Sequence, residues 1–340
     1  MTTNDLEWRE QAAAQLHGTL ALSVAYIGVV NGLFAALDDL DGAGPTVLAK
    51  TAGMDVGYVT RWCDAAYAFG LLDEADAARF TVTELGRAYR GNSLGTLMPF
   101  AVRAMLSTHM AERAAALMRS GERPGDGVLA ERETVVPWFG PMLEHQFGGF
   151  FEREILPSLP AYREVDRRGG LAVDLGCGNG WYVRRLVARY PGLRGLGLDA
   201  MAENITQAAE LAQAAGIADR LRFETGDIHD FQSLEPADLI AMNRALHHVW
   251  HDRENVFRII HDHLKPGGYA VIWEPNWPVE RSALRMPGRA GMAFQNLAEH
   301  VQGNHLLRPD EIAAQFRKVG MEPEIYLFAD GGEAVITAVR

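Results

Sequence analysis

Apolar and polar residues in the second half of the chain follow two alternating patterns. From Leu171 onward, short apolar runs typical of buried strands are separated by segments with the apolar period of a helix. Helical segments lie between the first five runs. This predicts a mostly parallel sheet with helices on both faces, a Rossmann-like α/β fold. The last two runs have no helix between them, so we expect a C-terminal β-hairpin. The predicted strands are Leu171–Leu175, Arg194–Leu198, Leu221–Glu224, Ala237–Met242, Tyr269–Trp273, Ile325–Phe328 and Ala334–Val339.

The first 120 residues are predicted to be mainly helical, with one short β interruption. Helical patterns cover Thr46–Ala52 and Met54–Leu71. A strand pair follows, with one arm around Asp73–Asp76 and the other carrying Phe80 and Val82. Two helices followed by a small hairpin are the outline of a winged helix. Between residues 46 and 90 there are five basic and six acidic residues, so contacts to DNA phosphates would be weak. We interpret this module as a dimerisation domain.

One stretch near the N-terminus carries no charge over 18 residues, from Leu20 to Leu37. This length is the lower limit for a helix that spans a bilayer. The stretch contains polar residues and glycines, lacks basic flanks and runs into Asp38 and Asp39, which favours a helix buried in protein. Left uncovered in a monomer, such a helix would expose a large apolar patch. We therefore expect a homodimer that does not insert into a membrane.

Composition narrows the class of protein. The 340 residues are 48% apolar, enough for a substantial core, and 44 acidic against 32 basic residues give a formal net charge of −12. A protein this acidic repels nucleic acid and anionic membranes on average. The two cysteines, Cys63 and Cys177, are too few for a disulfide framework or a cysteine-built zinc site. No secretory or transit signal opens the sequence, so we expect a cytoplasmic protein.

A glycine-rich loop follows the first predicted strand of the second half. Residues 171–180 read LAVDLGCGNG, in which an apolar strand reaches Asp174 and three glycines precede a helix. Glycines there allow a tight turn and the close approach of a ligand at the strand end. Their GxGxG spacing differs from the GxGxxG of dinucleotide-binding folds. Asp199 ends the next strand 25 residues after Asp174, where a carboxylate can accept both hydroxyls of a ribose. The loop glycines are Gly176, Gly178 and Gly180.

Four motifs then occur in order: VDLGCGNG at 173–180, GLGLD at 195–199, GDIHD at 226–230 and LKPGG at 264–268. Together they resemble a class I S-adenosylmethionine-dependent methyltransferase, and the first half resembles, more loosely, the winged-helix region of small-molecule O-methyltransferases. The resemblance divides the chain into three parts. Residues 1–120 are a helical dimerisation domain, residues 121–164 a helical linker contributing to the acceptor pocket, and residues 165–340 the methyltransferase domain.

This resemblance implies S-adenosylmethionine as the cofactor and S-adenosylhomocysteine as its product. By the same resemblance, Asp174 and the loop glycines hold the methionine moiety, and Asp199 binds the ribose. Asn243, just after the fourth predicted strand, approaches the methionine end. The residues expected against the adenine are Met201, Asp227 and Ile228.

The segment LHHVWHD at 246–252 resembles the LHDW-type segment of winged-helix O-methyltransferases, whose histidine is the general base. A hydroxyl acceptor must lose its proton, and a positioned histidine contributes roughly 10²–10⁴-fold to such a step. One extra residue before Trp250 leaves His247 or His248 as the base, and we prefer His247 because it follows Leu246 as the family histidine follows its leucine. In that family a glutamate from a later helix orients the histidine, and Glu299 is the nearest match.

The acceptor is expected to be a small aromatic or otherwise planar metabolite of the secondary-metabolite type. Its pocket is predicted from four places: the segment before the catalytic domain, the start of the helix after the glycine loop, the segment after the fourth strand, and the region following the proline-rich insert after the fifth strand. The residues predicted to line it are Trp138, Met142, His145, Gln146, Trp181, Trp250, Asn296 and His300.

Three alternatives stay open. His247 and His251 share one face of an α-helix, and with Glu299 or His300 they would make a metal site of the two-histidine, one-carboxylate type. A few relatives use such a metal to methylate the enol carbon of an α-keto acid, although we expect no metal here. In the second alternative, the enzyme uses S-adenosylmethionine without methyl transfer, for ring closure or for aminocarboxypropyl transfer. A protein of a different class would be a non-catalytic, cofactor-binding winged-helix regulator, which the acidic balance of residues 46–90 disfavours.

Overall fold

The predicted division into a helical first half and an α/β second half is seen in the computed structural model, which describes residues 3–76, 79–91, 95–125, 127–132, 134–233 and 235–340. The chain falls into two units. The first comprises Met1–Glu112 with Arg132–His145, and the second Arg113–Glu131 with Gln146–Arg340. The linker predicted at residues 121–164 is thus divided between the units, and its role in acceptor binding stays a prediction.

The first unit is helical apart from one strand pair, β1 (Leu72–Asp76) and β2 (Arg79–Val82). The predicted strand pair is thus present; its strands are antiparallel with Leu72 opposite Val82, and residues 77–78 lie outside the described residues. The helix preceding them starts where the Asp55 carboxylate accepts a hydrogen bond from the Tyr58 backbone N–H, an N-cap. The helices that begin in this unit are α1 (Thr3–Val30), α2 (Leu33–Asp39), α3 (Pro45–Ala52), α4 (Val56–Ala68), α5 (Glu84–Ala88), α6 (Met98–Leu117) and α8 (Val136–Phe150).

The uncharged stretch Leu20–Leu37 is not one helix. Helix α1 ends at Val30, and α2 starts at Leu33 after a break at Gly32, whose φ of 64° is a left-handed conformation that glycine adopts without strain. Behind the break, Leu33 and Phe34 are buried, and the Phe34 ring meets the Trp62 ring edge-on at 5.5 Å. The apolar run therefore forms the end of α1 and most of α2, and α2 packs in the core of the first unit.

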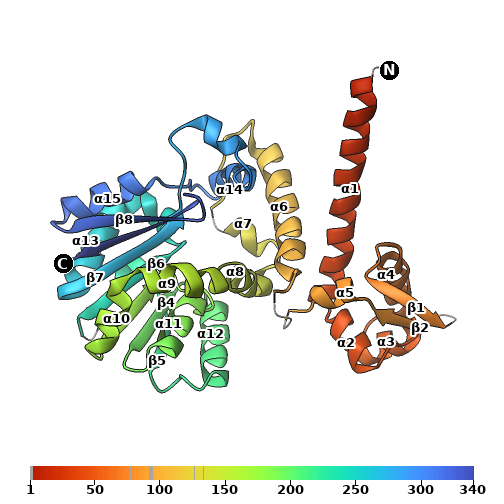
Figure 1. Ribbon diagram of the computed structural model, residues 1–340, viewed down its shortest axis with the longest axis horizontal. Coiled ribbons are helices and arrows are strands. Elements are labelled where there is room, and N and C mark those ends of the chain that lie inside the picture. Colours follow the sequence, from red (N-terminus) through yellow and green to blue (C-terminus); the bar gives the residue numbers. More distant parts are fainter. Residues whose placement is uncertain (1–2, 77–78, 92–94, 126, 133, 234) are drawn as a thin grey trace. The chain divides into compact units, whose positions relative to one another are not determined.

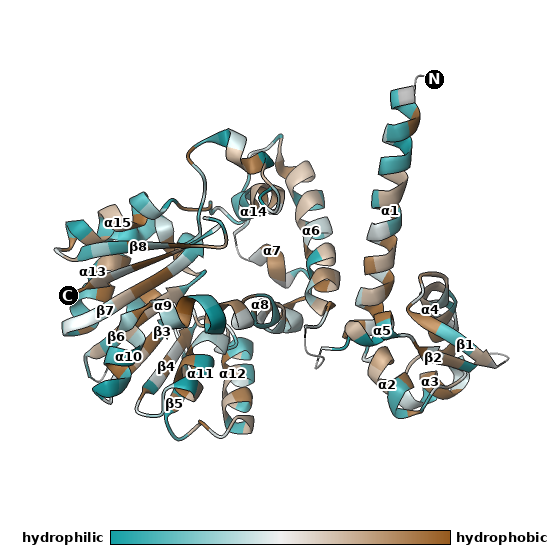
Figure 2. Cartoon of the chain, in the orientation of Figure 1, coloured by the Kyte–Doolittle hydropathy of each residue, from teal (hydrophilic) through white to brown (hydrophobic). Residues whose placement is uncertain are grey.

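Helix α1 is much longer than predicted, because its helical pattern extends back through a polar segment to Thr3. Figure 2 shows this change along the helix, from hydrophilic turns near the N-terminus to apolar turns near α2. By length and composition, Asn4–Val30 is sufficient to cross a membrane, and only 22% of its most apolar 18-residue window is buried inside the protein. Most of this helix therefore lies outside the core, although Ala25, Tyr26 and Val29 near its end are buried in it.

Seven strands form the sheet of the second unit, in the order β5-β4-β3-β6-β7-β9-β8 (Figure 1). The first five are parallel, and β9 runs antiparallel between β7 and β8, which confirms the predicted hairpin. All seven strands were expected, although β7 starts five residues earlier, at Leu264. Their bounds are β3 (Leu171–Leu175), β4 (Arg194–Asp199), β5 (Leu221–Thr225), β6 (Ala237–Asn243), β7 (Leu264–Pro275), β8 (Glu322–Phe328) and β9 (Glu333–Val339).

Chain order reverses at β3, because β4 and β5 extend the sheet to one side and β6 and β7 extend it to the other. Right-handed crossovers then place α11 and α12 on one face of the sheet and α13 on the opposite face. Open α/β sheets bind ligands at such a reversal, beyond the carboxyl ends of the strands. The remaining helices are α7 (Gly127–Ala130), η1 (Phe151–Ile155), α9 (Leu156–Ser158), α10 (Pro160–Arg167), α11 (Trp181–Arg189), α12 (Ala202–Ala214), η2 (Ile228–Asp230), η3 (Leu246–Asp252), α13 (Arg253–His263), η4 (Arg281–Arg285), α14 (Ala290–Val301) and α15 (Pro309–Lys318).

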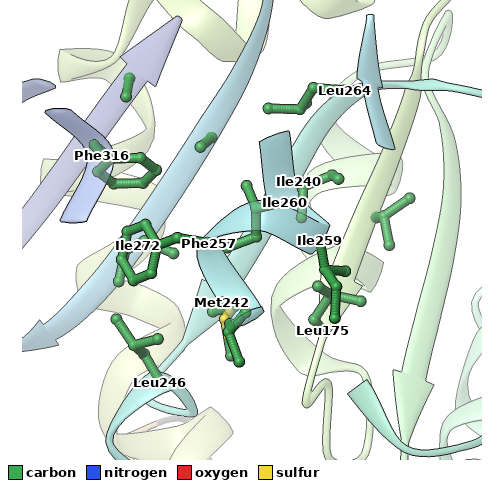
Figure 3. Packing of buried hydrophobic residues seen from close by; sticks show 14 of the residues in the cluster. Leu175, Ile240, Met242, Leu246, Phe257, Ile259, Ile260, Leu264, Ile272 and Phe316 are labelled. Atoms are coloured by element: carbon green, nitrogen blue, oxygen red, sulfur yellow. The ribbon is translucent and has the colours of Figure 1, made fainter. Parts of the chain in front are cut away.

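A hydrophobic core packs between the sheet and the helices α13 and α15 (Figure 3). Ile240 and Ile272 come from the central strands, while Phe257 and Phe316 come from the two helices, their rings 4.7 Å apart and edge-on. Each of these side chains is at most 1% exposed. This packing fixes the ends of β6 and β7, which carry the polar residues described next.

Candidate functional site

The glycine loop begins at the carboxyl end of β3, as predicted. Gly176, Gly178 and Gly180 all have left-handed φ angles, of 75°, 54° and 72°. The backbone N–H groups of Gly176 and Cys177 both donate to the Leu198 carbonyl, which holds the loop against β4. A Cβ atom on Gly176 would lie 2.6 Å from the Cβ of Ala245. Only glycine therefore lets this loop pass so close to the chain that follows β6.

Asp199 organises the neighbouring strand end. Its Oδ2 accepts a hydrogen bond from the Gly178 N–H at 2.8 Å, and its Oδ1 accepts from the Met201 N–H and from the Asn204 amide, both at 3.0 Å. These three bonds fix the direction of the carboxylate. A carboxylate has about four acceptor positions, so capacity for a hydroxyl remains. Met201, predicted to cover an adenine, is 41% exposed at the start of α12.

Three polar side chains beside the loop have buried atoms without a partner among the described residues. They are both carboxylate oxygens of Asp174, the amide nitrogen and oxygen of Asn179, and the amide oxygen of Asn243. Burial raises the pKa of Asp174 well above its usual range, and the nearby charge of Asp199 adds to that effect. Unpaired buried polar groups cost free energy until a partner satisfies them. A ligand that brings an ammonium and a carboxylate, as an amino acid does, fits this set.

Asp227 lies at the end of β5 and caps η2. Its Oδ1 accepts the His229 backbone N–H at 2.8 Å and lies 2.7 Å from His229 Nδ1. These hydrogen bonds lower the pKa of Asp227, so its carboxylate is held in the ionised form. The side chain is 60% exposed, while the neighbouring Ile228 packs against the core. Two of the three residues predicted against an adenine, the polar Asp227 and the apolar Ile228, are therefore at the same strand end.

His247 is the most enclosed histidine of the segment after β6, with 4% of its surface exposed. Its backbone N–H lies 3.3 Å from Glu274 Oε1, its Nδ1 lies 2.8 Å from Glu274 Oε2, and its Nε2 lies 3.7 Å from Glu299 Oε2. Burial by itself lowers the pKa of His247, but the two carboxylates outweigh burial and raise it to about 9. The ring is therefore an imidazolium at neutral pH, bracketed by two acids.

Glu274 was missed by the sequence analysis, which gave the orienting role to Glu299. Glu274 is 1% exposed near the end of β7, the strand paired with β6, and it makes the hydrogen bond to the imidazole. Glu299, on α14, lies on the other side of the ring and accepts a hydrogen bond from Gln302 at 3.2 Å. The sequence feature that could have pointed to it is an acid at the end of the apolar run VIWEP at 271–275.

The alternative metal site, His247 and His251 with Glu299 or His300, is not formed among the described residues. The segment Leu246–Asp252 is a 3-10 helix with three residues per turn, so His247 and His251 do not share a face. His251 is exposed, with its ring 6.2 Å from that of His229, and His300 is exposed on α14. A different group, His247, His248 and Glu299, has one ligand atom each within 4.8 Å of the others. The rings of His247 and His248 are 4.2 Å apart.

A pocket of about 480 Å³ lies beside His247. Trp250 is the one predicted acceptor-pocket residue that lines it. Gln315, on α15, is 7% exposed, and its amide oxygen has no partner among the described residues, so it can accept a hydrogen bond from a ligand. The residues lining the pocket are His247, Trp250, His251, Arg253, Gly303, Asn304, His305, Glu311, Ala314 and Gln315.

The other predicted pocket residues lie elsewhere. Trp138, Met142 and His145 belong to the first unit, where Met142 is buried in the core. In the second unit Gln146 is exposed, and Trp181 is buried in an aromatic cluster, 6.0 Å from the Trp273 ring. The Asn296 amide oxygen accepts a hydrogen bond from the Leu306 N–H. Contact of any of these residues with an acceptor stays a prediction.

Comparison with known proteins agrees with this geometry. Residues 172–268 match the family model described as a methyltransferase domain. Trans-aconitate 2-methyltransferase of Mycobacterium tuberculosis is 33% identical over 120 residues, which are 34% of this chain and 42% of that protein. The match thus spans less than half the length of this curated relative.

Solved structures match along the whole chain. Human N-acetylserotonin methyltransferase, in a complex with S-adenosylmethionine, superposes with a TM-score of 0.73 at 18% identity and covers 100% of this chain and 99% of that one. An O-methyltransferase from neocarzinostatin biosynthesis, bound to S-adenosylmethionine and 2-hydroxy-5-methyl naphthoic acid, has a TM-score of 0.64 at 16% identity and covers 96% and 97%. At these identities the likeness establishes the fold.

Proposed function

We propose that this chain, a class I S-adenosylmethionine-dependent methyltransferase by its domain and fold, methylates a hydroxyl oxygen of a small planar acceptor. The observation that carries the proposal is the buried His247, which follows β6 and is held by Glu274 of β7. Strand β6 pairs with β3, whose carboxyl end carries the glycine loop. That arrangement offers a fixed imidazole nitrogen at the place where an acceptor would lose its proton.

The chain's own residues fit the cofactor. Asp174, Asn179 and Asn243 would meet its amino-acid end, because their buried polar atoms lack partners among the described residues. Asp199 would accept the ribose hydroxyls, while Met201, Asp227 and Ile228 would lie against the adenine. When bound, S-adenosylmethionine supplies a methyl group on a sulfonium, ready for in-line transfer.

His247 would remove the acceptor proton. The hydrogen bond to Glu274 occupies Nδ1 and directs Nε2 toward Glu299, so Nε2 is the atom that takes the proton. Because the pKa of His247 is about 9, only about 1% of the rings are neutral at pH 7, and the active fraction grows about tenfold for each pH unit up to that value. Glu299, on the Nε2 side, would stabilise the imidazolium that forms.

The test is the variant His247→Ala. We expect S-adenosylhomocysteine to bind with unchanged affinity, measured by calorimetry, and methyl transfer to phenolic acceptors to fall at least tenfold, the low side of a general-base contribution of roughly 10²–10⁴-fold. Mass spectrometry of the products separates methyl transfer, which releases S-adenosylhomocysteine, from other uses of the cofactor, which release methylthioadenosine. Normal methyl transfer by His247→Ala would eliminate the general-base assignment.

An aromatic acceptor is supported by the pocket beside His247. Its volume of about 480 Å³ suits a molecule of one to three rings, and Trp250 offers an aromatic surface for stacking. The neocarzinostatin enzyme, which shares this fold, binds a hydroxylated naphthoic acid. We place the reaction in secondary metabolism on these grounds.

A cytoplasmic homodimer is the proposed state of the protein. On α1, Leu6, Leu20 and Ile27 are 44–48% exposed and are separated by multiples of seven residues, so they form one stripe, to which Leu16 belongs as well. A second copy of the chain is the occupant that suits this seam. Light scattering should give a dimer for the wild type and a monomer for the double variant Leu16→Glu, Leu20→Glu. A wild-type monomer would contradict the proposal.

Metal-assisted carbon methylation of an α-keto acid is the second candidate, favoured by the group His247, His248 and Glu299. Imidazole nitrogens with one carboxylate are a donor set suited to iron or zinc. Native mass spectrometry of the purified protein distinguishes the two candidates. A stoichiometric metal lost in His248→Ala would favour carbon methylation, whereas full oxygen methylation in the presence of a chelator would favour the first proposal.

A further inference from the structure

Arg244 has a strained backbone directly before the segment that carries His247. Its φ of 56° is left-handed, a conformation that side chains with a Cβ rarely adopt. Among the described residues, the other non-glycine positions with positive φ are Asp41, Ala329 and Asp330. Arg244 alone of these follows a strand of the candidate site. Such a strained backbone conformation persists only where surrounding contacts enforce it, so the contacts of Arg244 must hold it in place.

Four contacts hold Arg244 in this conformation. Its backbone N–H donates to the Trp273 carbonyl at 2.8 Å. Its guanidinium donates to both carboxylate oxygens of Glu333, at 2.9 and 3.1 Å, and lies over the Phe147 ring with its carbon 3.8 Å from the ring centroid. Both members of the ion pair are largely buried, with side chains 11% and 14% exposed. The Trp273 indole N–H also donates to Glu333, to its Oε2 atom, at 2.8 Å.

These contacts converge on the strand that carries the partner of His247. Trp273 immediately precedes Glu274 on β7, and Glu333, the first residue of β9, lies opposite Pro275. Arg244 therefore ties the chain leaving β6 to the same three residues of β7 that present the Glu274 carboxylate. Three residues later, the backbone N–H and Nδ1 of His247 both meet that carboxylate.

We infer that Arg244 is a positioning residue for methyl transfer: its ion pair with Glu333 fixes the left-handed turn that brings His247 onto Glu274. The inference rests on the proposed function, in which His247 takes the acceptor proton. It extends that function to a residue pair outside the group that would touch the acceptor or the cofactor.

The planar fork of an arginine is what this role demands. Two parallel N–H···O bonds to one carboxylate fix both the distance and the orientation of the guanidinium, while its flat face rests on Phe147. A lysine keeps the charge but has neither the fork nor the flat face. A glycine removes the backbone strain but also removes the ion pair. The lysine variant therefore tests whether the positive charge alone is sufficient, and the glycine variant tests whether relief of the backbone strain is sufficient.

The test compares Arg244→Lys, Arg244→Gly and Glu333→Gln with a matched control, Arg289→Lys, which alters an arginine that bonds the Asp330 carbonyl in the turn before β9. We expect the three site variants to lower kcat at least tenfold, with affinity for S-adenosylhomocysteine within about twofold of wild type. The control should keep its kcat. The double variant Arg244→Lys, Glu333→Gln should be little worse than either single one, because the two side chains act as a unit.

A spectroscopic readout keeps this inference separate from the proposed function. Nuclear magnetic resonance of the nitrogen-labelled protein should show a downfield Nδ1–H proton of His247 that Glu274→Gln identifies, and this signal should weaken or shift in Arg244→Lys. If the wild type transfers no methyl group but the signal still depends on Arg244, the proposed function fails and the positioning role stands. A normal kcat and an unchanged signal in Arg244→Lys and Glu333→Gln would overturn the inference.

Discussion

Replacing Glu274 with glutamine tests whether an ion pair, and not a neutral hydrogen bond, holds His247. The two side chains are 1% and 4% exposed, so solvent screens their interaction little. Folding raises the pKa of His247 from its ordinary value of 6.5 to about 9. At 1.36 kcal/mol per pH unit, this interval corresponds to about 3 kcal/mol of stability. Glutamine keeps the shape and an acceptor oxygen but removes the charge.

The sign of the pH dependence follows from the direction of each pKa change. Because the pKa of His247 is raised, its contribution is complete below pH 6.5 and is lost as the pH rises through 9. Burial of Glu274 opposes its ionisation, but the charge of His247 outweighs burial and lowers the pKa of Glu274 below its usual 4.5. The same interaction is therefore also lost in strong acid. Because Glu299 supplies a smaller part of the raised pKa, Glu274→Gln should cost most of this stability, about 2–3 kcal/mol at pH 6, and less than about 1 kcal/mol at pH 10.

The assay is urea unfolding followed by tryptophan fluorescence at pH 6 and pH 10, with the exposed Glu210→Gln on α12 as the matched control. The control should unfold like the wild type at both pH values. An equal loss of stability in Glu274→Gln at pH 6 and at pH 10 would refute the ion pair as the cause of the raised pKa, and would leave only lost packing or hydrogen bonding as the explanation.

Three further predictions concern the cofactor side and the pH range of activity. Asp199→Ala should abolish S-adenosylhomocysteine binding by calorimetry, because Asp199 orders both the loop and the start of α12, and an affinity within fivefold of wild type would contradict this. In Gly178→Ala the added Cβ meets no atom within 4 Å, so the variant should lose about 1 kcal/mol of stability for its left-handed φ alone. In Gly176→Ala the added Cβ also collides with Ala245, so this variant should lose more stability and bind S-adenosylhomocysteine more weakly. Equal thermal stability of the two variants would contradict the crowding at Gly176. The methyl transfer rate should rise with pH up to about 9, and a rate that is flat between pH 7 and pH 9 would argue against His247 as the base.

The centre of the sheet was predictable because its strands β3 and β6 are buried on both faces. Leu171–Leu175 and Ala237–Asn243 then read as mainly apolar runs, with an acid, Asp174 or Asp238, in each, and the helices between them keep a separate period. The hairpin β8–β9 followed from the missing helix between two such runs. The glycine loop and the acids at the strand ends were also within reach, since a parallel sheet places all its carboxyl ends at one edge.

The parts that escaped prediction depend on contacts between distant residues. Glu274 is 27 positions from His247, and only the pairing of β6 with β7 makes them neighbours. The 3-10 form of Leu246–Asp252 was equally invisible, because three- and four-residue periods cannot be separated over seven residues. At Gly32, an apolar pattern continued across a helix break that backbone conformation alone decides.

The edge strand β8 has a consequence for the behaviour of the protein at high concentration. An edge strand offers unpaired backbone groups to which another molecule can add a strand, and Ile325 and Leu327 on this one are 44% and 57% exposed. Pro323 lacks a backbone N–H, and Glu322 and Glu324 place two negative charges beside it. These residues act as gatekeepers against intermolecular β-aggregation, so the first half of β8 should be left intact in any effort to engineer or crystallise the protein.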